Sequence, residues 1–144
     1  MISKVLVTID GSAQSLKGID LALEFAQRNG SQIMLLEVVP AIPVYGPAES
    51  RFRHSIEERN AAMIKENEET LAKAGKRFEE LGIPYQAKVV VGDPAEEILR
   101  IAEEEKITII IIGNRGLTGA TKFLLGSVSS KVISHAHCNV LVTK

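Results

Sequence analysis

One run of six residues limits the possible folds of this chain more than any other feature. Residues 107–112 read ITIIII, so every position but one is isoleucine. Successive side chains of a β-strand point to opposite faces of its sheet, and a strand of this composition is therefore apolar on both faces. Strands of that kind belong to parallel sheets that are covered on both sides. The run predicts the central strand of a parallel sheet between two layers of helices.

The rest of the chain alternates between strand and helix patterns, as such a sheet requires. Apolar, β-branched runs predict four further strands, at residues 4–9, 31–39, 85–91 and 139–143. Helix patterns lie between the strands, the last of them over residues 127–136. This order favours parallel strands joined by right-handed crossovers. The expected fold is a three-layer α/β/α domain, and the chain length of 144 residues fits a single domain.

Capping residues and apolar stripes mark the other helices. Ser12 can cap the first helix, and Asp93 can cap the third, with Pro94 at its first position. The second helix is expected from about Ser50 to Leu81, and Gly75 inside it predicts a bend or break, because glycine weakens a helix by about 1 kcal/mol relative to alanine. The stripes predicted to be buried are Leu16, Ile19, Leu23 and Ala26 in the first helix, and Leu71, Ala74, Phe78 and Leu81 in the second.

Charge and cysteine content narrow the classes of partner. The formal net charge is −1, from 17 Lys and Arg against 18 Asp and Glu, which argues against nucleic acid or an anionic membrane as the main partner. The single cysteine, Cys138, excludes an internal disulfide and fits a reducing compartment. No apolar run approaches the roughly 18 residues of a membrane helix, and no secretory signal is evident. A cytoplasmic protein is expected.

A glycine-rich segment carries the functional signal. Directly after the apolar run the chain reads GNRGLTGATKFLLGSVSSKV, residues 113–132. Two residues separate Gly113 from Gly116, nine separate Gly116 from Gly126, and a helix is expected to begin at Ser127. Glycines let backbone N–H groups converge, and a helix N-terminus favours an anion. Further donors nearby are Arg115, Lys122, Ser129 and Ser130. The segment predicts a phosphate-binding loop.

One simpler interpretation and two other phosphate-binding motifs compete with this prediction. The segment could use glycine and serine only to turn, but long loops without regular structure are uncommon in compact domains and tend to be functional. Other phosphate-binding motifs do not fit. Neither Gly113 nor Gly119 begins the P-loop pattern, and the turn after the first strand, DGSAQS, lacks the Rossmann fingerprint.

Taken together, these motifs resemble the universal stress protein family. The spacing G-x2-G-x9-G-S is similar to the ATP-binding signature of that family, and VTIDGS, LLEVVP, VVVGDPAEEIL and GSVSSKVISHAHCNVLV agree with it elsewhere. The resemblance spans essentially the whole chain. It implies one domain over residues 1–144, with five parallel strands in the order 3-2-1-4-5, in the Rossmann-like, adenine nucleotide alpha hydrolase-like class.

The resemblance also implies a ligand and the residues around it. ATP would lie at the switch point between the first and fourth strands, with Mg²⁺ screening its phosphates. Asp10 and the main chain near Thr8 would face the nucleoside, and the main chain of Val38 would hold the adenine. The residues implied around the phosphates are Gly113, Arg115, Gly116, Gly126, Ser127, Val128 and Ser129. No catalytic residue and no metal ligand supplied by the protein is assigned.

Some positions depart from the family pattern or allow two interpretations. Members often have histidine where Glu37 stands and proline near residues 136–139, and some have proline at the position of Thr8. Glu37 adds a negative charge that could weaken nucleotide binding if it points inward. Asp10 follows an apolar strand, so its carboxylate either faces the ligand edge or stabilises the turn before the first helix.

The last strand and a cluster of metal-binding residue types each allow two interpretations. Residues Asn139–Thr143, NVLVT, would form an exposed apolar edge, which favours the homodimer that the resemblance implies, although Lys144 could guard the edge instead. His135, His137 and Cys138 invite a zinc site. Their side chains are expected to diverge where a helix end passes into a strand, so no metal site is predicted.

Three functional hypotheses follow from these observations. The leading one is a dimeric, ATP-binding regulatory module of the stress response that acts by binding rather than turnover. The second is an enzyme, either a slow ATPase or a protein that phosphorylates itself at Ser129 or Thr121. The third is a dimeric interaction scaffold without a nucleotide. The proline-rich connection around Tyr45 could fold over a bound nucleotide.

Overall fold

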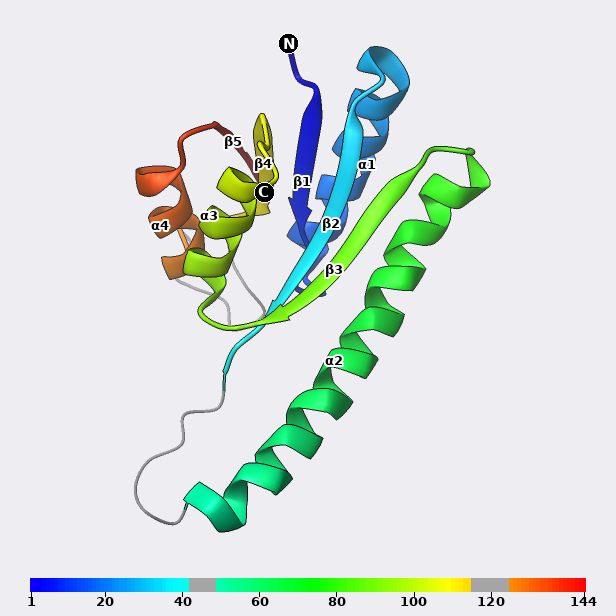
Figure 1. Ribbon diagram of the computed structural model, residues 1–144. Coiled ribbons are helices and arrows are strands. Elements are labelled where there is room, and N and C mark those ends of the chain that lie inside the picture. Colours follow the sequence, from blue (N-terminus) through cyan, green and yellow to red (C-terminus); the bar gives the residue numbers. More distant parts are fainter. Residues whose placement is uncertain (42–48, 115–124) are drawn as a thin grey trace.

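A parallel five-stranded sheet forms the centre of the protein (Figure 1). The computed structural model describes residues 1–41, 49–114 and 125–144. The strand order is β3-β2-β1-β4-β5, and every neighbouring pair is parallel, so the predicted fold and order are confirmed. The strands are β1 (Lys4–Thr8), β2 (Gln32–Val39), β3 (Tyr85–Val91), β4 (Ile109–Gly113) and β5 (Asn139–Thr143). The helices are α1 (Ala13–Asn29), α2 (Glu49–Glu80), α3 (Pro94–Glu104) and α4 (Ser127–His135).

The isoleucine run divides its side chains between two hydrophobic cores, one on each face of the sheet. Ile109 and Ile111 of β4 belong to the core that α1 and α2 cover. Ile110 and Ile112 belong to the core beneath α3 and α4. All four side chains are buried, so β4 is the doubly covered central strand that its composition predicts.

The first two residues of that run lie outside β4. The Ile107 amide donates to the Ala102 carbonyl at 2.9 Å and so closes the end of α3. Thr108 binds the start of β1 instead: its amide and its hydroxyl both donate to the Lys4 carbonyl, at 2.9 and 2.8 Å. The run therefore serves three purposes, and the strand begins two residues later than its composition indicates.

Two expectations about the helices were wrong. Helix α2 continues through Gly75, which lies buried against Tyr85, and a Cβ added there would be 2.2 Å from the tyrosine ring. Leu16 and Leu81 are 47% and 54% exposed. Leu81 lies just beyond the last residue of α2. On the buried face of α1, Gly18 packs against Val7 and Ile111.

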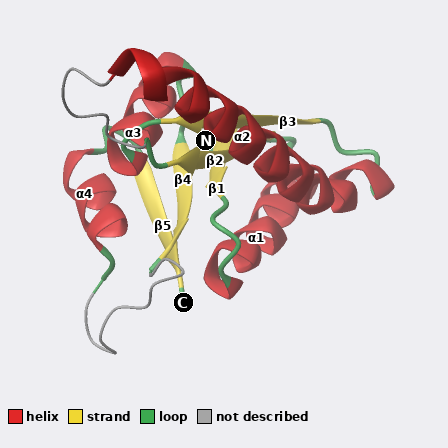
Figure 2. Ribbon diagram, turned by 90° about the horizontal axis from the view of Figure 1, so that it is seen from below, coloured by secondary structure: helices red, strands yellow, loops and turns green. Residues whose placement is uncertain are grey.

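The strands end at a common edge of the sheet. In Figure 1 the arrowheads of β2 and β3 point toward the lower edge, and Figure 2 views the molecule from below. The loop from β1 to α1 and the start of α4 also lie at this carboxyl edge, because each follows the end of a parallel strand. Within the described ranges no helix is long and apolar enough to span a membrane.

Candidate nucleotide site at the carboxyl edge

The N-terminus of α4 presents backbone donors without a side-chain cap. Gly126 is the N-cap residue, in an extended conformation, and no side chain among the described residues accepts a hydrogen bond there. The Ser130 amide donates to the Gly126 carbonyl at 3.0 Å. The amides of Ser127, Val128 and Ser129 come before that first helical bond and have no acceptor within the helix. Such a helix start favours an anionic ligand.

Three hydrogen bonds attach the start of α4 to the strands beside it. The Gly126 amide donates to the Asn114 carbonyl at 2.8 Å, and the Asn114 amide donates to the Thr143 carbonyl of β5 at 2.9 Å. The Ser129 hydroxyl donates to the Gly113 carbonyl at 2.5 Å. Five of the predicted residues are thus gathered at the end of β4, namely Gly113, Gly126, Ser127, Val128 and Ser129.

Ser129 contributes differently from the way its residue type suggests. Its side chain is buried, with 3% of the residue exposed, and its hydroxyl is already donated to Gly113. The hydroxyl therefore positions the helix against β4, and the group that Ser129 can offer to a ligand is its backbone amide. Ser127 and Ser130 are exposed.

The turn after β1 is stabilised by its own side chains. Asp10 Oδ1 accepts a hydrogen bond from the Ser12 amide at 2.8 Å, and the Ser12 hydroxyl accepts from the Ser15 amide at 3.2 Å. Gly11 has a φ of 80°, a left-handed conformation that suits glycine. Of the two interpretations of Asp10, the structure shows the turn contact. The residue is also exposed at the carboxyl edge, and Thr8 ends β1 just before it.

At the end of β2, Val38 and Glu37 face opposite sides of the sheet. Val38 packs against the core under α3 and α4, while Glu37 lies on the face that α2 covers. Its Oε2 atom is buried and has no hydrogen-bond partner in the part of the chain that the structure describes. Burial, followed by the charges of Asp10 and Glu66, raises the pKa of Glu37 from 4.5 to about 7. The sequence flagged Glu37 as a charge near the edge but gave no signal for Glu66 of α2.

Several predicted residues lie outside the part of the chain that the structure describes. They are Arg115, Gly116, Thr121, Lys122 and Tyr45. Asn114, which directly precedes Arg115, was not predicted. Its side-chain Oδ1 is buried and has no hydrogen-bond partner among the described residues.

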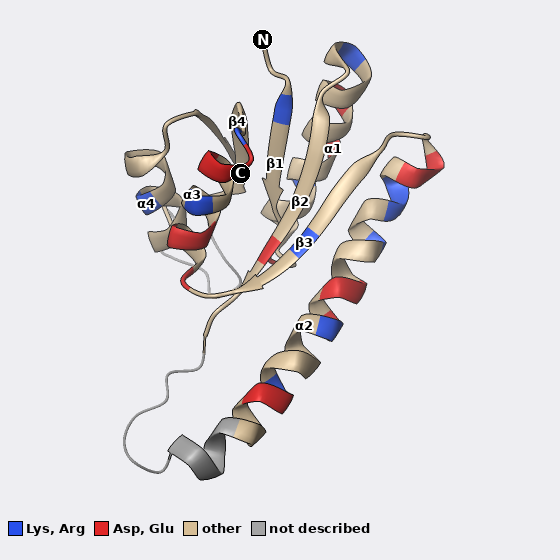
Figure 3. Ribbon diagram, viewed as in Figure 1, with Lys and Arg blue, Asp and Glu red and all other residues tan. Residues whose placement is uncertain are grey.

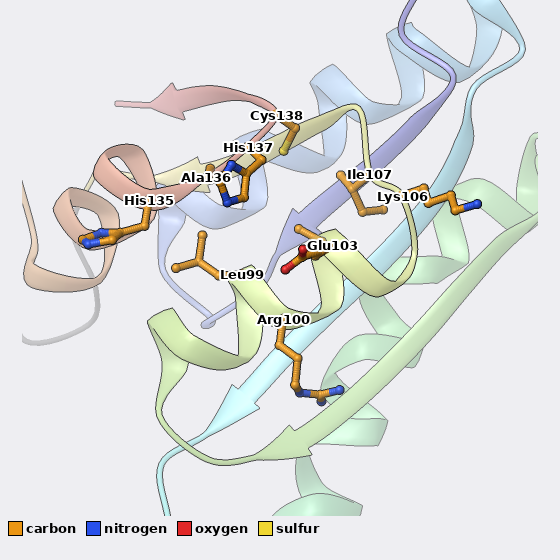
Figure 4. Close-up of a pocket in the computed structure, with 10 residues that line it drawn as sticks. Leu99, Arg100, Glu103, Lys106, Ile107, His135, Ala136, His137 and Cys138 are labelled. Carbon is orange, nitrogen blue, oxygen red and sulfur yellow. The ribbon is translucent and has the colours of Figure 1, made fainter.

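The histidine and cysteine cluster lies at the opposite edge of the sheet, beside a cavity of about 310 Å³ between α3 and the end of α4 (Figure 4). His135 points away from Cys138 in this view, and its Nδ1 lies 2.9 Å from the Lys131 carbonyl. Burial raises the pKa of the Cys138 thiol. Among residues 1–41, 49–114 and 125–144, no three His, Cys, Asp or Glu side chains are arranged to hold a metal ion.

Known proteins share both the sequence and this architecture. The universal stress protein family model matches residues 1–144. Universal stress protein MJ0531 of Methanocaldococcus jannaschii is 36% identical over 145 residues, covering 100% of this chain and 83% of its own. The solved structure of MJ0577, from the same organism, has a TM-score of 0.85 at 30% identity and covers 100% of this chain and 96% of its own. A universal stress protein in complex with cAMP has a TM-score of 0.65 at 26% identity, covering 99% and 96%.

The fold and the carboxyl edge by themselves define a class of protein. That class is a doubly wound α/β domain with an uncapped helix start at the carboxyl end of a central strand. With the match over its whole length, the chain belongs to the universal stress protein family.

Proposed function

We propose that the protein binds ATP, accompanied by Mg²⁺, at the carboxyl edge between β1 and β4, and that it acts as a regulatory module of the stress response. The observation that carries the proposal is the start of α4. Three backbone amides there lack helical acceptors, and hydrogen bonds hold them beside Gly113 at the end of a central strand. The related protein with bound cAMP supports an adenine nucleotide as the ligand class.

The chemical groups that these residues offer suit a nucleotide. Backbone amides at a helix N-terminus suit phosphate oxygens. Main-chain groups near Thr8 and Val38, together with the exposed Asp10 carboxylate, would receive the nucleoside. Arg115 and Gly116 complete the predicted phosphate set, and Mg²⁺ would neutralise part of the triphosphate charge when bound.

Binding without turnover is favoured over the enzymatic alternatives. Hydrolysis needs a group that orients water, and Asp10, the obvious carboxylate, is engaged with the Ser12 amide. Self-phosphorylation at Ser129 is disfavoured because that hydroxyl is buried and donated to Gly113. Thr121 remains the alternative acceptor for a self-phosphorylating protein.

A homodimer through β5 is part of the proposal. Among the described strands, β5 pairs with β4 alone, and its central residues, Val140, Leu141 and Val142, are only half-buried. Pairing of two such edges would cover apolar surface and satisfy free backbone groups. A cytoplasmic location and the absence of nucleic-acid and membrane partners also belong to the proposal.

Mass analysis of the nucleotide released from freshly purified protein tests the functional alternatives. Retained ATP supports the regulatory module, ADP or a phosphorylated chain supports the enzyme, and no nucleotide supports the scaffold. The Gly126→Val variant serves as the matched protein, since Gly126 has extended backbone angles that valine can adopt. We expect it to lose ATP binding with an unchanged circular dichroism spectrum. Equal ATP affinity in both proteins would contradict the assignment of the site.

A further inference from the structure

Glu37 is the feature of the carboxyl edge that the proposed function leaves without a role. We infer that Glu37 is a specificity-determining residue, which makes the edge discriminate among adenine nucleotides by the negative charge of their phosphates. The inference rests on the proposed function, because it concerns the same site. It concerns which nucleotide the site prefers, and under which conditions.

The position of Glu37 in the sheet places a carboxylate close to the site without making it part of the phosphate loop. In β2, Ile33 and Leu35 face the core under α1 and α2, and Glu37 follows them on the same face. It pairs in register with Val89 of β3. The buried Oε2 atom has no donor within hydrogen-bond reach in the described structure, so none of the described residues compensates a charge at that atom by a hydrogen bond.

The charges around Glu37 come from three neighbouring elements. Asp10 after β1 and Glu66 on α2 both act on Glu37, and both are negative. Figure 3 shows a basic position on β3 beside an acidic position on β2. Lys88 of β3 pairs in register with Leu36, so it lies on the other face from Glu37; there the hydrogen bond and charge of Lys4, and to a smaller extent the charge of Lys88, lower the pKa of Glu105. Lys65, Glu68 and Glu69, the charged residues next to Glu66 along α2, are exposed to solvent, as Glu66 is, but only Glu66 among them shifts the pKa of Glu37.

The protonation of Glu37 therefore changes the charge of the edge near neutral pH. With its pKa raised to about 7, the carboxyl is neutral in mildly acidic solution and ionised in mildly alkaline solution. Ionisation adds to the charges of Asp10 and Glu66 instead of neutralising them. An anionic ligand at the same edge is then repelled.

The range of this repulsion reaches the proposed phosphates. Strand β1 separates β2 from β4, so the two strand ends are about 10 Å apart. At that distance one unit charge changes the affinity for each further ligand charge by about threefold at low salt. Without Mg²⁺, ATP carries about two more negative charges than AMP, so ionised Glu37 should weaken the binding of Mg²⁺-free ATP relative to that of AMP by about tenfold.

The test compares wild type with Glu37→Gln, using AMP and ATP as probes at pH 6 and pH 8.5 in low salt and in the absence of Mg²⁺. For each protein we take the ratio of the ATP dissociation constant to the AMP dissociation constant. The quotient to be compared is this ratio for wild type divided by this ratio for the variant, so the protonation of the nucleotides themselves cancels. We expect this quotient to be close to one at pH 6 and to rise to about ten at pH 8.5. It should shrink in 0.5 M salt, because screening weakens charge effects.

Glu69→Gln is the matched control, since it removes an exposed carboxylate from α2 that does not act on Glu37. Its quotient should stay near one at both pH values. A quotient near one at pH 8.5 for wild type against Glu37→Gln would overturn the inference while leaving nucleotide binding intact. If wild type binds neither AMP nor ATP at either pH, the proposed function fails as well.

Discussion

Two helices begin at the same edge of the sheet, and their first turns are built in opposite ways. At α1, the side chains of Asp10 and Ser12 accept hydrogen bonds from backbone amides of their own turn. At α4, Gly126 provides no side-chain cap, and the contacts that fix the helix come from the strands and leave its first amides available. The comparison teaches that side chains can satisfy the backbone donors at one helix start and so stabilise it, whereas the donors at the neighbouring helix start lack a side-chain cap and stay available for the proposed ligand.

Proline at the first helical position gives the largest expected effect and tests the difference directly. Ser127→Pro removes one amide donor from α4, yet proline is well tolerated at that position of a helix. We expect ATP affinity to fall by at least tenfold, since one charge-assisted hydrogen bond is worth about 1.5–3 kcal/mol. The matched variant Ala13→Pro makes the same change in α1. Calorimetric titration of both should show a loss for Ser127→Pro alone, and equal losses would erase the distinction.

Removal of the α1 cap should produce the converse result. Ser12→Ala deletes the hydroxyl that accepts the Ser15 amide, and loss of such a cap costs about 1 kcal/mol of stability. We expect a lower free energy of unfolding in urea with nucleotide affinity changed by less than twofold. A large loss of affinity without a loss of stability would mean that α1 also serves the ligand.

Glu37 gives the smallest effect and extends the comparison to charge. Acidic groups gather near the α1 start, while the first residues of α4, 126–130, carry no charge. Because the folded-state pKa of Glu37 is raised, its contribution to stability is present below pH 4.5 and is lost as the pH rises through about 7. The residue is half-buried, so partial contact with solvent limits the loss to about 0.5–1 kcal/mol. Glu37→Gln should remove this pH dependence in urea unfolding, whereas Glu69→Gln should keep it.

The fold was predictable because its signals are local. The isoleucine run required burial on both faces, and the predicted caps at Ser12 and Asp93 are present. The continuity of α2 was not predictable from Gly75 alone, because the partner that fills the space beside it is Tyr85 of another element. Helix propensity describes an isolated helix. In this protein the contact between Gly75 and Tyr85 outweighs the low helix propensity of glycine, and α2 continues.

The backbone arrangement of the candidate site was predictable, whereas the contacts of its side chains were less so. Glycine spacing brought Gly113, Gly126 and the start of α4 together, as expected. The hydroxyl of Ser129 donates to the Gly113 carbonyl of β4, and the pKa of Glu37 is raised by burial, then by Asp10 and then by Glu66, which is 29 positions along the chain. Contacts of this kind arise only when the elements pack. Arg115 and Gly116 stay predictions.

The backbone of Asn114 joins parts of the protein that the proposal assigns to different tasks. Its amide donates to the Thr143 carbonyl of the last strand, and its carbonyl accepts from the amide of Gly126, the N-cap residue of α4. A shift of α4 toward a ligand must therefore stretch or tilt the neighbouring contact with β5. If the proposed ligand and the proposed pairing through β5 both hold, ligand occupancy and self-association would be linked energetically, and each would strengthen or weaken the other by the same factor.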